Sequence, residues 1–382
     1  MHVALCTQQF GNYWSGLGNY ATLLARGLSQ KGVRLTIITP GTPLENIAAD
    51  YIHVEPSKLD KTHGGWFSLA RAYRRALADL DADVIHFTDA RESYGYQAHT
   101  PAIGTLHDDY FARHGWSPFH YLKDYQDWIV RYAYYSFVTC TERRALSQLS
   151  GLISNSRATA ETIQARYGID PQRVRTIYIE PELTDHPVGS DREKERLTAP
   201  KLLFVGGNVQ RKGLRTVFEA LKQLQTQFPD LKLQVLGKNQ NITRLSRLSH
   251  KMGLADSVVF EGWVPPEQVG EHYSAASIFV MPSLMEGYGL VFLEAMAYAV
   301  PVIGSNVGGI RELIQHEQNG LLVEPRDADR LAEQIRRLLL DTDLRQKLIS
   351  AGTQTVKQLS TERMIEETLS FYDTVRGNHE HE

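Results

Sequence analysis

The chain has 382 residues and a formal net charge of -3, with basic and acidic residues interspersed along it. This length exceeds what one hydrophobic core usually supports, so we expect two or three domains. The near-neutral charge carries no global field that would favour nucleic acid as a partner. Two cysteines, Cys6 and Cys140, are too few for a disulfide framework or a thiolate zinc site, and such usage suits a reducing cytosol.

The N-terminal stretch M-H-V-A-L-C-T-Q-Q-F has no basic segment ahead of an apolar one, so we expect no export signal. The most apolar region, residues 290–303, contains Glu294 and Pro301 and is too short to cross a bilayer. We therefore expect a cytoplasmic protein for which any membrane contact is peripheral, at the inner membrane face.

Short β-branched runs alternate with amphipathic stretches in the first half of the chain. Strands are predicted at H-V-A-L-C-T, V-R-L-T-I-I-T, A-D-V-I-H-F-T, P-A-I-G-T-L-H, G-L-I-S-N and V-R-T-I-Y-I, and a helix from about residue 18 to residue 30. Such alternation is typical of βαβ units and a parallel sheet. We assign residues 1–183 to one Rossmann-like, doubly wound α/β domain.

A polar segment without an apolar stripe, residues 184–200, predicts an interdomain linker. Strands are predicted after it at K-L-L-F-V-G-G, L-K-L-Q-V-L-G, S-V-V-F-E-G, S-I-F-V-M-P, P-V-I-G-S and G-L-L-V, separated by helical spacing. We assign residues 201–360 to a second Rossmann-like domain and expect a helix at about 361–376 to pack back on the first. Doubly wound sheets bind ligands at the carboxyl ends of their strands, so we expect the chemistry in a cleft between the domains.

The segment M-E-G-Y-G-L-V-F-L-E-A-M places two glutamates eight positions apart. We expect a strand to end near Met281, Glu286 to lie in the following loop, and a helix to begin at Gly289 or Leu290. Glu294 then lies about one turn inside that helix. Taken alone, each glutamate is better explained as a loop acid or an exposed helix position, and only the surrounding sequence reverses that judgement.

The start of this helix is predicted to bind an anion, because Gly287 and Gly289 lack side chains and let a ligand approach the free amides. A carboxylate can accept both hydrogens of a vicinal diol, which a sugar or a ribose presents. A nucleotide sugar fits this pattern, with its diphosphate at the helix start, its sugar on Glu286 and its ribose on Glu294.

The block E-G-Y-G-L-V-F-L-E-A-M-A, with P-V-I-G-S-N-V-G-G-I-R-E-L-I and N-G-L-L-V after it, resembles the signature of the retaining glycosyltransferases of family four. The resemblance implies the two-domain GT-B fold and places the E-x7-E pair of that family on Glu286 and Glu294. It implies transfer of a sugar from a nucleoside-diphosphate sugar, a UDP- or GDP-sugar, to a hydroxyl acceptor such as a glycan, glycolipid or small molecule. The donor is a substrate, so no cofactor is expected. No Asp-x-Asp motif sits at a strand end, so we also expect metal independence.

The stretch F-V-G-G-N-V-Q-R-K-G-L places Arg211 and Lys212 after the first strand of the second domain and before a helix. Two adjacent cations there can neutralise a leaving diphosphate, although solvated cations before a helix explain this stretch equally well. A basic pair near this position has the first role in the family. Some members carry a further arginine where this chain has Gly207, so a smaller cationic clamp is expected.

The loop G-N-Y-W-S-G-L-G-N-Y follows the first strand, and Gly16 and Gly18 can let backbone amides approach a phosphate or a sugar. A dinucleotide-binding fingerprint would have glycine in place of Ala21 and an acidic residue after the next strand, so an oxidoreductase function is less favoured. It is not excluded, because a variant of the fingerprint that ends in alanine is allowed. The resemblance implies that this loop faces the donor diphosphate and the acceptor, with Asn12 and Trp14 as acceptor contacts.

His107, in T-L-H-D-D, lies just beyond a predicted strand, where a histidine satisfied by local backbone is also common. The resemblance implies that His107 orients the donor sugar and that Asp108 and Asp109 meet acceptor hydroxyls. It also implies that the loop around Gly262 to Val264 holds the base. The predicted catalytic residues are Glu286, His107, Arg211 and Lys212, and the predicted substrate-binding residues are Gly16, Gly18, Gly262, Val264, Gly287, Tyr288, Gly289, Leu290 and Glu294.

Two further pairs have structural interpretations. Asn155 and Ser156 are predicted as a strand end and a helix N-cap. Gly308 and Gly309 are predicted to form a turn packed beside the nucleotide loop.

Two rival functions share this architecture. A nucleotide-sugar epimerase would need no acceptor pocket, and a non-catalytic binding subunit would bind the donor without transfer. The presence of both glutamates and both cations makes the second less attractive. The donor base and sugar, the acceptor, the linkage and the oligomeric state leave no readable mark on the sequence.

Overall fold

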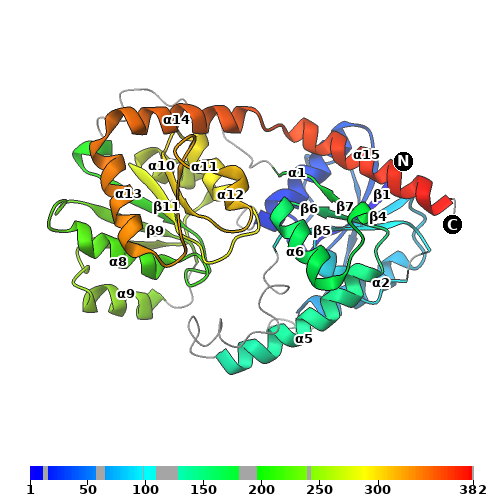
Figure 1. The fold of residues 1–382 in the computed structure, drawn as a ribbon. Helices are drawn as coiled ribbons and strands as arrows, with labels where there is room; N and C mark the ends of the chain where they lie inside the picture. The colour runs from blue at the N-terminus through cyan, green and yellow to red at the C-terminus, as the bar shows by residue number, and fades with distance from the viewer. Residues whose placement is uncertain are drawn as a thin grey trace. The chain divides into compact units, whose positions relative to one another are not determined.

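The computed structural model describes residues 1–11, 16–56, 65–97, 99–108, 128–179, 196–238 and 242–380. The chain divides into two compact units, unit 1 (Met1–Glu182 with Ser360–Glu382) and unit 2 (Leu183–Leu359). Each unit is built on its own parallel sheet, with helices on its faces (Figure 1). The predicted fold class of two Rossmann-like, doubly wound α/β domains is confirmed.

Unit 1 contains a seven-stranded sheet in the order β3-β2-β1-β4-β5-β6-β7, and each neighbouring pair is parallel. The strands are β1 (His2–Cys6), β2 (Arg34–Thr39), β3 (Asp50–His53), β4 (Val84–Phe87), β5 (Ala102–Leu106), β6 (Gly151–Ser154) and β7 (Val174–Thr176). The helices are α1 (Gly16–Gln30), α2 (Gly65–Leu77), α5 (Trp128–Ser147), α6 (Arg157–Tyr167) and α15 (Thr361–Glu380), with 3-10 turns η2 (Ala90–Ser93) and η3 (Pro171–Arg173). The central strands β1, β4, β5 and β6 are buried almost throughout, as near-continuous apolar runs of a covered parallel sheet require.

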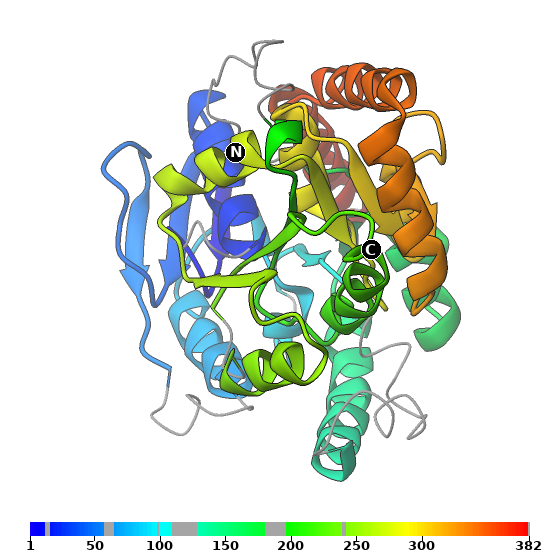
Figure 2. The ribbon, with the colours of Figure 1, turned by 90° about the vertical axis from the view of Figure 1, so that its left-hand side faces the viewer.

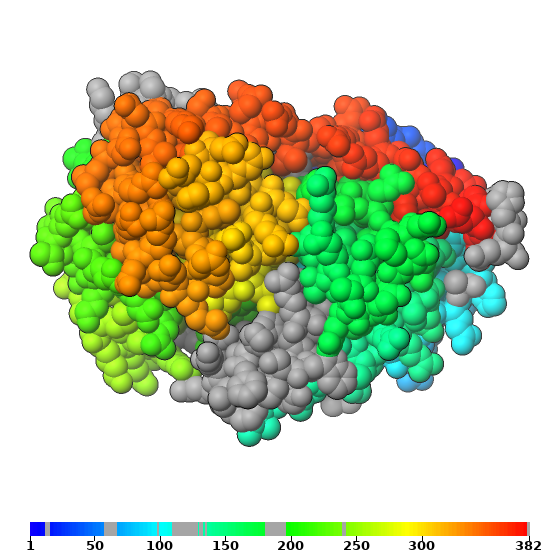
Figure 3. All heavy atoms as spheres, viewed as in Figure 1, coloured from blue at the N-terminus to red at the C-terminus, as the bar shows by residue number. Residues whose placement is uncertain are grey.

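The last helix, α15, belongs to unit 1 and contacts α1 (red in Figure 3). It packs closely because β6 begins with Gly151, whose Cβ, if present, would lie 2.8 Å from the ring of Phe371. At the surface, Lys31, which directly follows α1, lies 2.9 Å from the carboxylate of Glu362. A helix that follows unit 2 in sequence is therefore part of the core of unit 1.

Unit 2 contains a six-stranded parallel sheet in the order β10-β9-β8-β11-β12-β13. The strands are β8 (Lys201–Val205), β9 (Lys232–Leu236), β10 (Val258–Gly262), β11 (Ile278–Met281), β12 (Val302–Ser305) and β13 (Leu321–Val323). The helices are α8 (Leu214–Leu224), α9 (Ile242–Lys251), α10 (Pro266–Ala275), α11 (Leu290–Ala297), α12 (Ile310–Leu313), α13 (Ala328–Leu340) and α14 (Thr342–Lys357). Helix α8 packs against α13, and α11 packs against α14 (Figures 1 and 2). The strand order reverses direction between β8 and β11, which is where doubly wound sheets bind ligands.

The described part of the predicted linker is packed against unit 2. The buried side chain of Arg196 donates hydrogen bonds to three backbone carbonyls, Ser274 O (2.8 Å), Tyr298 O (3.0 Å) and Ala299 O (2.8 Å). These carbonyls lie at the C-terminal ends of α10 and α11, where a cation interacts favourably with the helix dipole. Arg196 therefore fixes the two helix ends relative to each other.

Helix α1 begins earlier than predicted. The sequence suggested a start near Gly18, but the helix already includes Gly16. The first turn contains two glycines and therefore lacks the apolar periodicity from which a helix start is predicted.

Within the described part of the chain, none of the helices combines the length and the apolar character that a bilayer crossing needs.

Candidate active site

The loop between β11 and α11 in unit 2 has the predicted boundaries. Strand β11 ends at Met281, and α11 begins at Leu290 after Gly289 as its N-cap. Gly289 has a φ of 97°, and a Cβ there would lie 2.9 Å from the ring of Phe292. Only glycine suits this position, so α11 starts without a side chain on its N-cap residue. Glu294 lies in the second turn of α11, as the sequence predicts.

Glu286 in this loop faces the two predicted cations. Its Oε1 lies 3.6 Å from Arg211 Nη1, and its Oε2 lies 3.7 Å from Lys212 Nζ. The glutamate is 9% exposed, and Ser283 Oγ donates to its Oε2 over 3.4 Å. These distances exceed the 2.7–2.9 Å typical of short charge-assisted hydrogen bonds. Glu286 is therefore a loose counter-ion for both cations.

Burial and charge act in opposite directions on these groups. Burial acts to raise the pKa of Glu286, but the charges of Lys212 and Arg211 outweigh it and hold the pKa below its ordinary value. Burial lowers the pKa of Lys212, which Glu286 opposes. The carboxylate is thus ionised because the cations are there, and an anionic ligand would compete with it for them.

Glycines at the end of β8 position Lys212. Gly206 has a φ of 152°, and a Cβ there would lie 2.3 Å from Lys212 Cδ. Gly213 has a φ of 76°, and a Cβ there would lie 2.0 Å from the carbonyl oxygen of Pro282. The glycines of F-V-G-G-N-V-Q-R-K-G-L therefore let the lysine stem cross the end of β8 and let α8 start against the Glu286 loop.

Gly308 and Gly309 pack against the same loop, as predicted. A Cβ on Gly308 would lie 2.0 Å from the carbonyl oxygen of Glu286, and one on Gly309 would lie 2.2 Å from that of Gly287. The amide of Gly309 donates to Glu286 O over 3.2 Å. This backbone contact holds the loop from the side of β12.

Glu294 has a partner that the sequence did not reveal. The hydroxyl of Tyr273 on α10 lies 2.6 Å from Glu294 Oε2. Burial raises the pKa of Glu294, whereas the hydrogen bond from Tyr273 and the charge of Lys212 act to lower it. Tyr273 lies on a different helix from Glu294, so no local spacing could have identified the pair.

The remaining predicted donor residues lie in the same unit. Gly262 has a φ of 71° and accepts a hydrogen bond from the Gly237 amide over 2.7 Å, which joins the loops that follow β9 and β10. The side chains of Val264 and Tyr288 are buried. A base held by this loop would therefore meet backbone groups rather than the Val264 side chain.

In unit 1, His107 follows β5 and its ring is fixed by its neighbours. The ring Nε2 lies 2.6 Å from the carbonyl oxygen of Thr88, which can only accept, so Nε2 carries the hydrogen. The ring of Tyr20 packs edge-on against it with centroids 5.2 Å apart. Asn155 Nδ2 donates to the carbonyl of His107 over 2.8 Å, and Ser156 caps α6, as predicted. Burial lowers the pKa of His107, so the imidazole is neutral and Nδ1 is its acceptor.

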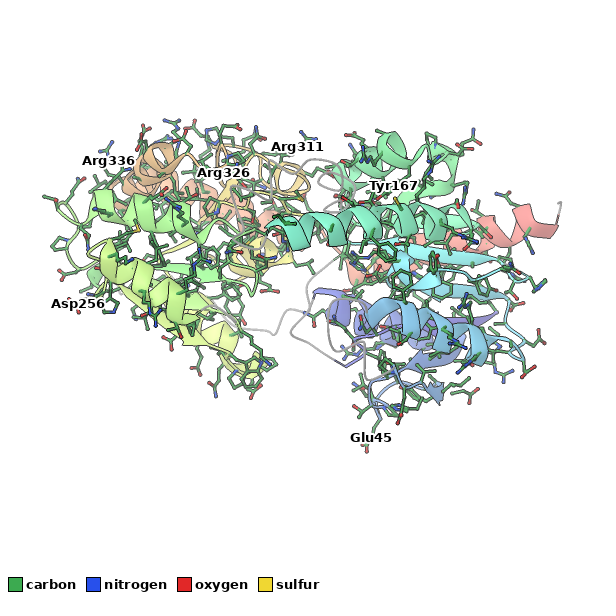
Figure 4. The ribbon with its side chains drawn as sticks, turned by 90° about the horizontal axis from the view of Figure 1, so that it is seen from below. Glu45, Tyr167, Asp256, Arg311, Arg326 and Arg336 are labelled. Atoms are coloured by element: carbon green, nitrogen blue, oxygen red, sulfur yellow. The ribbon has the colours of Figure 1, made fainter. Side chains whose placement is uncertain are left out.

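A group of charged residues near His107 was not predicted. Arg91 forms a two-pronged ion pair with Asp89, with Nε–Oδ1 at 2.8 Å and Nη2–Oδ2 at 2.6 Å. Asp108, a predicted acceptor residue, contributes to the electrostatic environment of Arg91. The buried Glu142 of α5 accepts a hydrogen bond from Tyr167, the last residue of α6, which is labelled in Figure 4. Asp89 and Arg91 follow β4 directly, so the rule that singled out His107 could have found them.

The other predicted residues of unit 1 divide into two sets. Gly16 and Gly18 lie in the first turn of α1 and not in a loop, because the helix begins at Gly16. Asn12, Trp14 and Asp109 lie outside the described residues.

Comparison with known proteins places both units in one family. Residues 14–179 match the model described as Glycosyltransferase Family 4, and residues 189–355 match the model described as Glycosyl transferases group 1. The chain belongs to the family 4 glycosyltransferases. In this family 4 chain, each model covers the main part of one unit.

Two relatives illustrate the similarity. Over 173 residues the family 4 chain is 35% identical to a GDP-mannose-dependent alpha-(1-6)-phosphatidylinositol monomannoside mannosyltransferase of Mycobacterium tuberculosis, a match that covers 43% of this chain and 45% of that protein. Over 235 residues it is 30% identical to a D-inositol 3-phosphate glycosyltransferase of Acidothermus cellulolyticus, covering 58% and 52%. The chain thus spans about half the length of the relatives it matches.

Solved structures resemble the chain over nearly its whole length. A sucrose-phosphate synthase of Thermosynechococcus elongatus superimposes with a TM-score of 0.81 at 23% identity, covering 99% of each chain. HepE of Anabaena, solved in complex with UDP, gives a TM-score of 0.71 at 21% identity, covering 97% of this chain and 100% of that one. These similarities confirm the GT-B fold.

Proposed function

We propose that this chain is a retaining glycosyltransferase that moves a sugar from a nucleoside-diphosphate sugar to a hydroxyl acceptor without a metal. The observation that carries the proposal is the placement of Glu286 between Arg211 and Lys212 in the loop that leads into α11. A carboxylate that suits a sugar, two cations that suit a diphosphate, and a helix N-terminus capped by glycine thereby lie in one loop region of unit 2.

The two cations are the proposed source of charge stabilisation for the leaving group. Arg211 can meet two phosphate oxygens with its planar fork, and Lys212 adds a compact charge. The amides at Gly289 and Leu290 add the positive end of the α11 dipole. Such preorganised positive groups stabilise charge that develops on the diphosphate in the transition state.

The two glutamates are proposed to hold the two diols of the donor. When the diphosphate takes over Arg211 and Lys212, the carboxylate of Glu286 is released from its ion pairs and can accept from sugar hydroxyls. Glu294 accepts from the ribose. His107, with Nδ1 as its acceptor, is proposed to take a hydrogen bond from a further sugar hydroxyl, which is orientation and not proton transfer.

The proposed transfer step needs no covalent enzyme intermediate. The bond between the anomeric carbon and the diphosphate oxygen breaks, and the acceptor oxygen forms a new bond to that carbon on the same face. The acceptor proton passes to an oxygen of the leaving diphosphate. The protein contributes charge stabilisation and orientation, the two effects expected for a reaction with a charged leaving group.

Relatives guide the choice of substrates to test. The mycobacterial relative is named as GDP-mannose-dependent, and HepE was solved with UDP. Two relatives are named for acceptors that contain inositol. We therefore propose a UDP- or GDP-sugar as donor and a polyol or glycolipid hydroxyl as acceptor.

The first test is donor binding and slow donor hydrolysis across UDP-, GDP- and ADP-sugars, with and without EDTA. Selective binding that EDTA leaves unchanged, with release of the nucleoside diphosphate, is the expected result. Loss of turnover in EDTA that added Mg²⁺ restores would overturn metal independence. Binding without hydrolysis or transfer would instead indicate a binding subunit, and conversion of the donor to another nucleotide sugar would indicate an epimerase.

The anomeric configuration of the product tests retention. Once a donor and an acceptor are known, the coupling constant of the anomeric proton in the NMR spectrum of the product reports its configuration. An α-linked product from an α-linked donor is expected, and a β-linked product would contradict the proposal.

A further inference from the structure

The hydroxyl of Tyr273 is a buried group in unit 2 that the proposed mechanism does not use. It lies 2.6 Å from Glu294 Oε2 and 3.4 Å from the carbonyl oxygen of Val291. A phenol has one proton to donate, and the bond to the Glu294 carboxyl is the shorter of the two. The hydroxyl of Tyr273 is therefore committed to Glu294.

The ring that carries this hydroxyl is held on several sides. Tyr273 is 1% exposed and stacks on Tyr298 with ring centroids 5.5 Å apart and 14° between the planes. Phe279 of β11 packs against it with centroids 6.0 Å apart. Arg196 donates to the carbonyl of Ser274, the residue after Tyr273, and to the carbonyl of Tyr298 itself. The hydroxyl therefore presents itself to Glu294 in a fixed direction before any ligand binds.

The carboxylate of Glu294 keeps acceptor capacity beyond this bond. An ionised carboxylate offers about four lone-pair sites, of which Tyr273 takes one on Oε2. Rotation of Glu294 is restricted by the bond, so Oε1 and the remaining sites have a defined direction. A vicinal diol needs two such sites at a fixed spacing.

We propose that Tyr273 is a positioning residue for nucleotide recognition, which fixes the carboxylate of Glu294 in the orientation that accepts from both ribose hydroxyls. This inference rests on the proposed function, because it takes ribose as the ligand of Glu294. It adds a residue from α10 to a site otherwise built from the α11 loop and the Arg211–Lys212 pair.

The inference predicts how nucleotide binding depends on pH. Among the described residues, Tyr273 of α10 and Lys212 of the loop after β8 are the titratable groups that act on Glu294. Both oppose the effect of burial, which raises the pKa of Glu294. Loss of the Tyr273 hydroxyl would therefore raise that pKa further, and nucleotide binding would begin to weaken at a higher pH as the pH falls.

The experiment measures binding of UDP, GDP and ADP, and of their 2′-deoxy forms, by calorimetry between pH 5.5 and 8. The variants are Tyr273→Phe, Glu294→Gln and the double variant. Tyr298→Phe is the matched control, because it removes a hydroxyl from the stacked ring and leaves the bond to Glu294 in place. Thermal unfolding checks that each variant is folded.

We expect Tyr273→Phe to weaken binding of the ribonucleotide about tenfold and to affect the 2′-deoxy form much less. Tyr298→Phe should show neither effect, and Tyr273→Phe should cause no further loss in the Glu294→Gln background. In the wild type, which needs no substitution, the preference for ribose over 2′-deoxyribose should shrink as the pH falls. Once a donor is known, Tyr273→Phe should raise KM and leave kcat nearly unchanged.

Two outcomes would overturn the inference without touching the proposed function. One is unchanged ribonucleotide affinity in Tyr273→Phe. The other is an equal loss for ribose and deoxyribose forms that persists in the Glu294→Gln background, which would assign Tyr273 a packing role. Wild-type protein that binds none of the nucleotides would overturn the proposed function, and the inference with it.

Discussion

At the carboxyl edge of the sheet in unit 2, Glu286 keeps its charge between Arg211 and Lys212, whereas in unit 1 burial shifts several ionisable groups toward their neutral forms beside the charged Asp89–Arg91 pair. Glu286 stays ionised between two cations. In unit 1, burial lowers the pKa of His86 to about 3 and raises that of Glu142 to about 7. Burial also holds the pKa of Glu92 well above its ordinary value.

This difference matches what each unit is proposed to bind. A diphosphate carries charge and needs mobile counter-charges that can exchange partners, which the loose ion pairs of Glu286 provide. A sugar hydroxyl is neutral, and in unit 1 the neutral imidazole of His107 is proposed to accept from it without the cost of a buried charge. The predictions that follow test the charged groups of unit 2 and the neutral groups of unit 1.

The largest effect is expected for Glu286→Gln. The amide keeps the shape but cannot serve as a charged acceptor for the sugar, so kcat should fall by about 10²–10³-fold, equivalent to about 3–4 kcal/mol. Nucleoside diphosphate should bind more tightly, because Arg211 and Lys212 lose their internal counter-ion. Steady-state kinetics and calorimetry with UDP or GDP check both results. Normal kcat, or weaker binding of the diphosphate, would contradict the role given to Glu286.

Glu142→Gln tests whether the buried carboxyl group of Glu142 in unit 1 holds its proton in the folded chain. The folded-state pKa of about 7 lies above the ordinary value of 4.5, so the unfolded chain loses this proton at lower pH than the folded chain does. The stability of the wild type should therefore fall by about 3 kcal/mol as pH rises from below 4.5 to above 7. The glutamine variant still accepts from Tyr167 and should lack this slope, so it should be the more stable protein at pH 8.

Urea unfolding at pH 5, 7 and 8 measures these slopes. Glu161→Gln, which changes an exposed glutamate on α6, is the control and should unfold as the wild type does at each pH. A Glu142→Gln variant with the same pH slope as the wild type would show that Glu142 is ionised in the folded chain.

Lys212→Met tests one of the two cations with an apolar side chain of similar length, which removes the ammonium together with its hydrogen bond to Met281 Sδ. Loss of one charge-assisted contact should weaken nucleoside diphosphate binding by about 30-fold, or about 2 kcal/mol, and should affect the bare nucleoside little. Lys222→Met, an exposed position on α8, should bind as the wild type does. Equal losses for nucleoside and diphosphate would indicate a collapsed loop instead of a lost charge.

The sequence predicted the candidate-site residues of unit 2 more completely than those of unit 1, for a physical reason. The residues of the Glu286 loop, the α11 start and the Arg211–Lys212 pair follow strands directly, so short spacing was enough to predict where they lie. Tyr273 reaches Glu294 from another helix, and Glu142 meets Tyr167 across two helices. Contacts of that kind depend on how helices pack, which no local pattern encodes.

The same limit applies to the fold. Both parallel sheets were predicted because apolar runs of strand length alternate with helical periods. Helix α1 already includes Gly16, slightly ahead of the predicted start at about Gly18, because the glycines of its first turn interrupt the pattern. Pairs of polar groups buried in the core, such as His86 with Tyr372, could not be predicted at all, since they are 286 positions apart.

The smallest effect is expected for Tyr372→Phe, which breaks a buried chain of hydrogen bonds in unit 1. Tyr372 on α15 lies 2.6 Å from His86 Nδ1, His86 Nε2 lies 2.7 Å from Thr105 Oγ1, and that oxygen lies 2.9 Å from Tyr20 OH. The variant leaves one ring nitrogen of a neutral, buried histidine without its partner, which should lower the free energy of unfolding by about 1 kcal/mol. Nucleotide binding, which we assign to unit 2, should be unchanged. If calorimetry instead shows weaker nucleotide binding with no loss of stability, these hydrogen bonds serve ligand binding. The contrast between the charged groups of unit 2 and a neutral, structural hydrogen-bond network in unit 1 would then not hold.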